Sequence, residues 1–164
     1  MTKLDFMKIA LKEAKKAKQQ DEVPVGAVIV YDGKIIAKAY NKREKSKDAT
    51  NHAEILCIKK ACKKMKDFRL LDADIYVTLE PCLMCLGAIL NARIKNVYFG
   101  ASINKEGALT SKDIIERVEL NHKCEIEGGI LAEECSSLVS DYFKTKRKNK
   151  KEVQIKIDKG IIFI

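Results

Sequence analysis

The order of hydrophobic and polar residues along this chain predicts an α/β protein. Residues 2–20 carry apolar side chains on one side of a helix and lysines on the other. Asp32-Gly33 separates two apolar runs and is the strongest β-hairpin signal in the sequence. The pattern predicts strands over 25–31, 34–39, 74–79, 96–100 and 123–127, and further helices over 52–66, 81–91, 111–117 and 130–148. Elements in this order form a mixed sheet with helices on both faces.

Two segments do not fit this alternation. Residues 41–51 predict a polar loop that leads into the helix over 52–66. Residues 152–164 alternate in part and end in Ile161-Ile162-Phe163-Ile164, so they fit either an added edge strand or an exposed tail. We therefore predict one domain over residues 1–150 and a C-terminal tail of unassigned role over 151–164.

The composition fits a single globular domain in the cytoplasm. The 164 residues suffice for a proper core. No apolar run is long enough to span a membrane, and the N-terminus lacks the apolar stretch of a signal peptide. In a reducing compartment the six cysteines favour metal binding over disulfides. The net charge of +9 points toward a polyanionic partner, although a coat of exposed lysines gives the same value.

Candidate chemistry is concentrated in two short segments, His52-Ala53-Glu54 and Pro81-Cys82-Leu83-Met84-Cys85. His52, Cys82 and Cys85 supply three ligands suited to zinc, and Glu54 is a carboxylate that need not be a ligand. A structural zinc site is usually closed by four protein ligands, whereas a hydrolytic site keeps one position for water. The combination therefore indicates an open zinc site with a proton carrier beside it.

Both segments are predicted to lie at the start of a helix. Pro81 suits the first turn of one helix, where Cys82 and Cys85 would point to the same side. Thr50 and Asn51 are N-cap candidates for the other helix, over 52–66, which begins with His52 and Glu54. The positive end of a helix favours the thiolate form of cysteine.

A lone Cys-x-x-Cys also occurs in redox pairs and in structural zinc knuckles. The redox interpretation is disfavoured, because thioredoxin-like motifs belong to a different βαβ context. A closed zinc site would need a fourth ligand, but Cys57 lies roughly 140° round the helix from His52 and so points elsewhere. We interpret His122 as a surface or loop histidine and the other cysteines as core residues. These are Cys57, Cys62, Cys124 and Cys135.

The end of the last predicted helix places Tyr142 and Phe143 beside a dense basic run that reaches Lys151. Nucleic-acid sites combine aromatic rings that stack on bases with cations that contact phosphates. A solvated basic helix end produces the same pattern and complements the helix dipole. If the zinc site acts on a nucleobase, RNA binding is the favoured interpretation, with Phe143 and Arg147 as candidate contacts.

His-x-Glu followed by Pro-Cys-x-x-Cys is the signature of zinc-dependent nucleobase deaminases. From about residue 5 to 148 the chain resembles the bacterial tRNA adenosine deaminases, which belong to the cytidine deaminase-like superfamily. The resemblance is carried by Glu22-Val23-Pro24-Val25-Gly26-Ala27, Tyr40-Asn41, His52-Ala53-Glu54, residues 77–85, Phe99-Gly100-Ala101 and residues 129–144. It implies a three-layer α/β/α fold with a mixed five-stranded sheet, a homodimer and one zinc ion per chain. The implied reaction is hydrolytic deamination of the wobble adenosine in a tRNA anticodon stem-loop to inosine.

The resemblance also implies roles for individual residues. Glu54 is expected to carry protons between water and the adenine ring. Asn41 is expected to hydrogen-bond the nucleotide, although an ordinary turn asparagine would occupy such a position equally well. The backbone of Ala53 and the side chain of Leu79 are expected to shape the pocket.

Three segments depart from the family pattern, and none belongs to the zinc motif. Asp48-Ala49-Thr50-Asn51 replaces the usual Asp-Pro-Thr-Ala, Ser102-Ile103 stands where an acidic residue is expected, and Leu109-Thr110-Ser111 replaces a Gly-Ser pair. The second and third lie in a loop expected to frame the nucleotide, so they bear on substrate identity.

Two alternative functions therefore stay open. The same site could deaminate a free base or nucleoside, guanine or cytosine, with no dependence on the basic helix end. A non-catalytic, zinc-stabilised RNA-binding module is a further alternative. It would need a fourth protein ligand, and it leaves Glu54 without a role.

Overall fold

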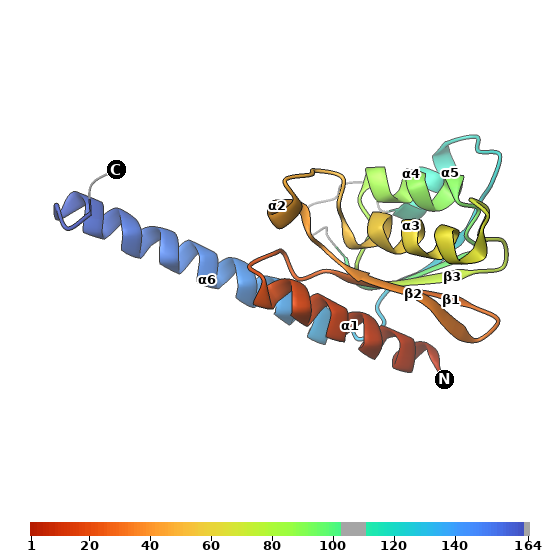
Figure 1. The fold of residues 1–164 in the computed structure, drawn as a ribbon, viewed down its shortest axis with the longest axis horizontal. Coiled ribbons are helices and arrows are strands. Elements are labelled where there is room, and N and C mark those ends of the chain that lie inside the picture. The colour runs from red at the N-terminus through yellow and green to blue at the C-terminus, as the bar shows by residue number, and fades with distance from the viewer. Residues whose placement is uncertain (103–110, 163–164) are drawn as a thin grey trace.

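The protein is described by a computed structural model that covers residues 1–102 and 111–162. Figure 1 shows the order of elements along the chain. They are α1 (Lys3–Gln19), β1 (Gly26–Tyr31), β2 (Lys34–Tyr40), α2 (Arg43–Ser46), α3 (Ala53–Met65), β3 (Asp74–Leu79), α4 (Leu83–Asn91), β4 (Asn96–Ala101), α5 (Ser111–Arg117), β5 (Glu125–Glu127) and α6 (Ala132–Asp158).

The strands form one mixed sheet in the order β2-β1-β3-β4-β5, so the predicted five-stranded sheet is confirmed. β1 runs antiparallel to both β2 and β3, whereas β3, β4 and β5 are parallel. Asp32 and Gly33 form the predicted hairpin turn between β1 and β2. Their φ angles are +48° and +69°, as a turn that matches the twist of the two strands requires.

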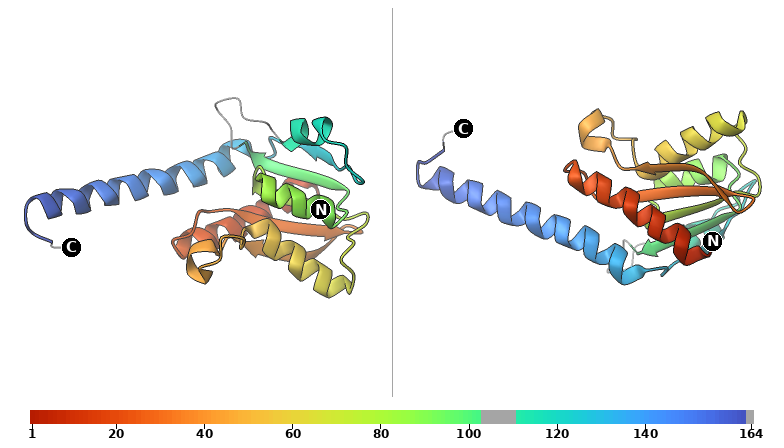
Figure 2. Two further views of the ribbon diagram at one scale, coloured as in Figure 1. Left: turned by 90° about the horizontal axis from the view of Figure 1, so that it is seen from above. Right: turned by 60° about the horizontal axis from the view of Figure 1, so that its bottom comes forward.

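Helices cover both faces of the sheet, which gives the predicted three layers (Figures 1 and 2). One face packs against α3, α4 and α5 around a core that includes Ile29, Ile75 and Val97. The other face packs against α1 and α6 around Met7 and Val28. Alternate residues of β1 thus enter different cores, as the side-chain period of a strand requires.

The two helices predicted to carry the chemistry begin one or two residues later than expected. His52 is itself the N-cap of α3, in place of Thr50 or Asn51. Cys82 is the N-cap of α4, so Pro81 precedes the helix instead of occupying its first turn. Both caps have extended backbones and neither uses its side chain to cap the helix, which leaves the imidazole and the thiol free for other partners.

Two further predictions about the chain were wrong. The polar segment 41–51 contains a short helix, α2. The last helix does not stop at residue 148 but continues unbroken to Asp158. Residues 151–158 are therefore not an edge strand; they form a helical extension that is almost entirely exposed, which agrees with the alternative of an exposed tail. No glycine or proline interrupts the helix before Gly160, which has a φ of +68°. The alternation of Val153 and Ile155 resembles a strand, yet both side chains are about half exposed, at 48% and 50%.

The distal part of α6 extends away from the rest of the protein, as all three views show (Figures 1 and 2). In the part of the chain that the structure describes, no helix is long and apolar enough to cross a membrane.

Candidate metal centre and active site

The fold brings His52, Cys82 and Cys85 together where α3 and α4 begin. His52 Nδ1 lies 3.6 Å from Cys82 Sγ and 3.5 Å from Cys85 Sγ, and one ligand atom from each residue lies within 4.8 Å of the others. Nitrogen and sulfur ligands bound to one tetrahedral zinc at about 2.1 and 2.3 Å would be about 3.6 Å apart. The donor set and its spacing therefore fit one zinc ion per chain.

The protonation of the two thiols supports the same interpretation. A hydrogen bond from the Cys85 thiol lowers the pKa of Cys82 to about 5. That interaction, together with burial, raises the pKa of Cys85. Without a cation the pair thus favours one thiolate and one thiol, whereas a bound metal ion stabilises both thiolates.

No fourth protein donor joins this group among the described residues. Cys57 is buried and its thiol donates to the carbonyl of Ala27 at 3.6 Å, so it points away from the site as predicted. Cys124 and Cys135 are also buried, whereas Cys62 is only partly so. His122 lies in the loop before β5, with Nε2 2.7 Å from the carbonyl oxygen of Ile94. The arrangement disfavours a closed structural zinc site.

Glu54 lies in the first turn of α3, beside the donors, and is only 4% exposed. Burial raises the pKa of its carboxyl group to about 7. Both protonation states are therefore accessible near neutral pH, which is the property that general acid–base catalysis requires.

A cavity of about 130 Å³ lies next to these groups. Three residues expected to contact the nucleotide, Asn41, Ala53 and Leu79, line it together with His52 and Glu54. The sequence did not single out four other lining residues as site residues; these are Val23, Val25, Arg43 and Glu80.

The amide of Asn41 already holds the backbone beside the cavity. Its Nδ2 donates to the carbonyl oxygen of Val23 at 3.2 Å, and its Oδ1 accepts from the amide of Arg43 at 3.1 Å. The side chain is 6% exposed. Asn41 thus has the bonds of a turn residue and also faces the cavity, and its contact with the nucleotide remains a prediction.

Phe143 and Arg147 do not line this cavity; both lie on α6. Phe143 is 43% exposed and packs edge-on against Tyr142, with ring centres 5.4 Å apart. Arg147 lies with Lys144, Lys148 and Lys151 along one side of the helix. The residues predicted to form the site therefore fall into two separate regions, the cavity beside the metal donors and the basic side of α6, and the role of the second region remains a prediction.

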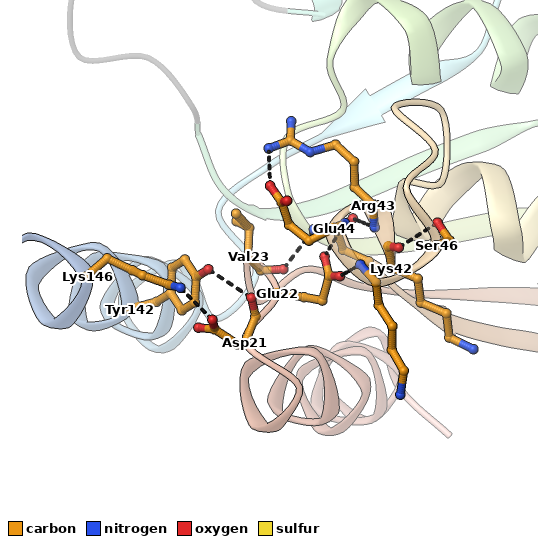
Figure 3. Close-up of polar contacts among 11 residues, drawn as sticks. Asp21, Glu22, Val23, Lys42, Arg43, Glu44, Ser46, Tyr142 and Lys146 are labelled. Carbon is orange, nitrogen blue, oxygen red and sulfur yellow. Dashed lines mark hydrogen bonds and ion pairs between the residues drawn. The ribbon is translucent and has the colours of Figure 1, made fainter. Parts of the chain in front are cut away.

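The Asp21–Val23 segment joins these two regions. The hydroxyl of Tyr142 donates to the carbonyl oxygen of Asp21 at 3.2 Å, and Lys146 Nζ lies 2.6 Å from Asp21 Oδ2 (Figure 3). Lys146 is thus already paired with an acidic group, whereas no ion pair involves Lys144, Arg147 or Lys148 within residues 1–102 and 111–162.

The loop that differs from the family pattern is only partly described. Ser102 donates to Glu80 Oε2 at 2.8 Å, and Ser111 begins α5. Ile103, Leu109 and Thr110 lie outside the described residues, so their predicted effect on substrate choice remains a prediction.

A mixed sheet between two helical layers, with a His, Cys, Cys donor set beside a buried carboxyl group, defines the cytidine deaminase-like class of proteins. A family model described as the cytidine and deoxycytidylate deaminase zinc-binding region matches residues 1–101. The chain is 46% identical over 147 residues to the tRNA-specific adenosine deaminase of Bacillus subtilis, covering 89% of this chain and 91% of that protein. The corresponding enzyme of Haemophilus influenzae is 45% identical over 148 residues, which are 89% of this chain and 86% of that one.

Solved structures of deaminases have the same fold. A structure from work on A-to-I editing by tRNA:A34 deaminases at the wobble position superposes with a TM-score of 0.77 and 41% identity, over 82% of this chain and 98% of that one. Guanine deaminase from Bacillus subtilis superposes with a TM-score of 0.60 and 40% identity, over 71% of this chain and 69% of that one. The chain belongs to the family of tRNA-specific adenosine deaminases.

Proposed function

We propose that this protein is a zinc-dependent hydrolase that converts adenosine to inosine at the wobble position of a tRNA anticodon. The observation that carries the proposal is the buried Glu54 carboxyl group, placed beside a three-donor metal site in a cavity. The names of the relatives support the substrate class, because the same tRNA specificity recurs in proteins about 45% identical to this one.

The reaction replaces the exocyclic amino group of adenine with oxygen and releases ammonia. Zinc held by His52, Cys82 and Cys85 would lower the pKa of water toward about 7 and so supply the nucleophile at neutral pH. Glu54 accepts a proton from the water and delivers protons to the ring nitrogen and then to the departing nitrogen. Its pKa of about 7 suits both steps.

Three residues that line the cavity would orient the base. We propose that Asn41 hydrogen-bonds the nucleotide, and that the Ala53 backbone and the Leu79 side chain enclose the ring. A nucleotide in an anticodon loop can leave its stack and enter such a cavity, whereas a paired base cannot do so without unpairing.

We further infer that the enzyme is a homodimer and acts in the cytoplasm, where a tRNA-modifying enzyme of this family would meet its substrate. Residues 1–150 would form the catalytic domain, with 151–164 as a C-terminal addition. Light scattering on the purified protein measures the oligomeric state directly.

A free base is the second candidate substrate, and the similarity to guanine deaminase favours it. Incubating the protein with anticodon stem-loops, guanine, cytosine and free nucleosides, and then measuring inosine and ammonia, separates the candidates. We expect inosine in the stem-loop reaction only. Ammonia from guanine with an unchanged stem-loop would overturn the proposal, and no product from any substrate would favour the non-catalytic RNA-binding module.

The basic helix yields a separate prediction. Lys146→Ala/Arg147→Ala/Lys148→Ala should raise KM for the stem-loop, because contacts to phosphates would be lost. Each lost contact should also reduce the slope of log affinity against log salt concentration by about 0.7–0.9. Phe143→Ala should instead cost roughly 1–3 kcal/mol of binding with little change in slope, if the ring stacks on a base. Zinc content should not change in either variant.

A matched control removes three exposed charges from α1, as Lys8→Ala/Lys12→Ala/Lys15→Ala. Measuring KM at several salt concentrations compares the two triple variants. Identical behaviour of the α6 variant and the parent at every salt concentration would show that the basic run is only a solvated surface.

A further inference from the structure

Glu22 is a carboxylate that is fully buried, at 0% exposure, between α1 and β1. No cation is paired with it in the described part of the chain. Its two oxygens instead accept hydrogen bonds from backbone amides. Oε2 accepts from the amide of Glu44 at 3.1 Å (Figure 3), and Oε1 accepts from the amide of Lys45 at 2.6 Å. Burying a charged group is unfavourable unless hydrogen bonds replace those it made with water. The two amides provide such bonds to the Glu22 carboxylate.

The amides that Glu22 binds belong to α2, a helix of four residues. The first amides of any helix lack partners within the helix, and the side chain of the N-cap residue Lys42 does not cap α2. One helical turn is also too short to be stable on its own. Glu22 therefore supplies the acceptors that this turn does not provide for itself.

The same turn presents two residues to the cavity. Asn41 and Arg43 both line it, and the amide of Arg43 donates to Asn41 Oδ1 at 3.1 Å. Asn41 Nδ2 in turn donates to the carbonyl oxygen of Val23, the residue next to Glu22. Residues 22–23 and 41–45 are thus joined by three hydrogen bonds, and three residues of these segments, Val23, Asn41 and Arg43, line the cavity.

We infer that Glu22 is a positioning residue for the reaction. It touches neither the metal donors nor the cavity, but it fixes the turn that holds Asn41 and Arg43 against the cavity. The inference rests on the proposed function, because it assigns these two residues to the nucleotide that enters the cavity. Loss of the carboxylate should therefore affect recognition of the nucleotide more than the acid–base step.

The kinetic test compares Glu22→Gln with the parent on the stem-loop. The amide keeps the shape of the side chain but replaces one acceptor with a donor that faces an N–H group. We expect kcat/KM to fall about tenfold to a hundredfold, as for a displacement of about 1 Å near a reacting group. Most of the loss should appear in KM, and zinc content should be unchanged. Glu22→Asp, which keeps the charge, should show a smaller fall in kcat/KM than Glu22→Gln.

A matched control is Glu13→Gln. Glu13 is also a buried glutamate, at 5% exposure, but it lies on α1 and pairs with Lys16 at 2.7 Å, away from the cavity. Its variant should keep the kcat/KM of the parent. In an Arg43→Ala/Asn41→Ala background, Glu22→Gln should cost much less than in the parent. An equal cost in both backgrounds would overturn the inference, since a general loss of stability would be additive.

A second readout does not depend on the substrate. Hydrogen exchange of the Glu44 and Lys45 amides should be slow in the parent and faster in Glu22→Gln, while exchange within α3 stays the same. Equal exchange of these two amides in both proteins would overturn the inference whatever the activity. Inactivity of the parent on the stem-loop would count against the proposed function alone.

Discussion

Replacing Glu54 by glutamine is expected to remove nearly all turnover while the protein keeps its fold and its zinc. The amide has almost the same size as the carboxyl group, so the cavity should be preserved, but it cannot accept or deliver protons. General acid–base catalysis contributes about 10²–10⁴-fold to the rate. Because one carboxyl group would serve several proton transfers here, we expect the loss in kcat to lie at the upper end of this range.

Single-turnover rates on the stem-loop measure the effect, and elemental analysis checks the metal. Glu13→Gln is again the matched control, because it makes the same change at a buried glutamate outside the cavity. Near-normal turnover by Glu54→Gln with full zinc content would refute the catalytic assignment.

Removal of either cysteine ligand should have the largest effect on stability. Cys82→Ala and Cys85→Ala each leave two donors, so zinc should be lost and its binding free energy with it. We expect the free energy of unfolding to fall by several kcal/mol, compared with about 1 kcal/mol for an ordinary substitution. Activity should be lost together with the metal.

Elemental analysis and denaturant titration of the purified variants test this expectation. Cys124→Ala serves as the control, because this buried cysteine belongs to the core and not to the donor group. Full zinc content in both ligand variants would refute the ligand set. Release of zinc from the control variant would instead indicate a closed site and favour the binding module.

The sequence predicted those parts of the site that depend on local chemistry. Three features follow from residues close together in the chain: the Asp32-Gly33 turn, the run from β3 into the Cys82–Cys85 segment, and the occurrence of His52 and Glu54 in one short motif. The metal donors then meet because α3 and α4, which pack side by side on one face of the sheet, begin next to each other.

Other parts of the site depend on contacts between distant residues and backbone groups. The short helix α2 is capped by Glu22, more than twenty residues earlier, through backbone amides that any residue type provides. In the sequence, the segment around Glu22 is distinguished only by its resemblance to a family, because nothing local marks Glu22 as a capping residue. The length of α6 was missed because half-exposed Val153 and Ile155 follow the period of a strand.

The projection of α6 has a consequence for the range over which its charges act. Lys146 is the last residue of this helix with an ion pair or hydrogen bond to another element in the described chain. From there to Asp158 the helix spans about 18 Å at 1.5 Å per residue. That is about twice the distance of roughly 8 Å over which counterions screen a charge at physiological ionic strength. The cations at the far end of α6 therefore lie well beyond the screening distance from the point where the helix meets Asp21, so a ligand must extend along α6 itself to come within their range.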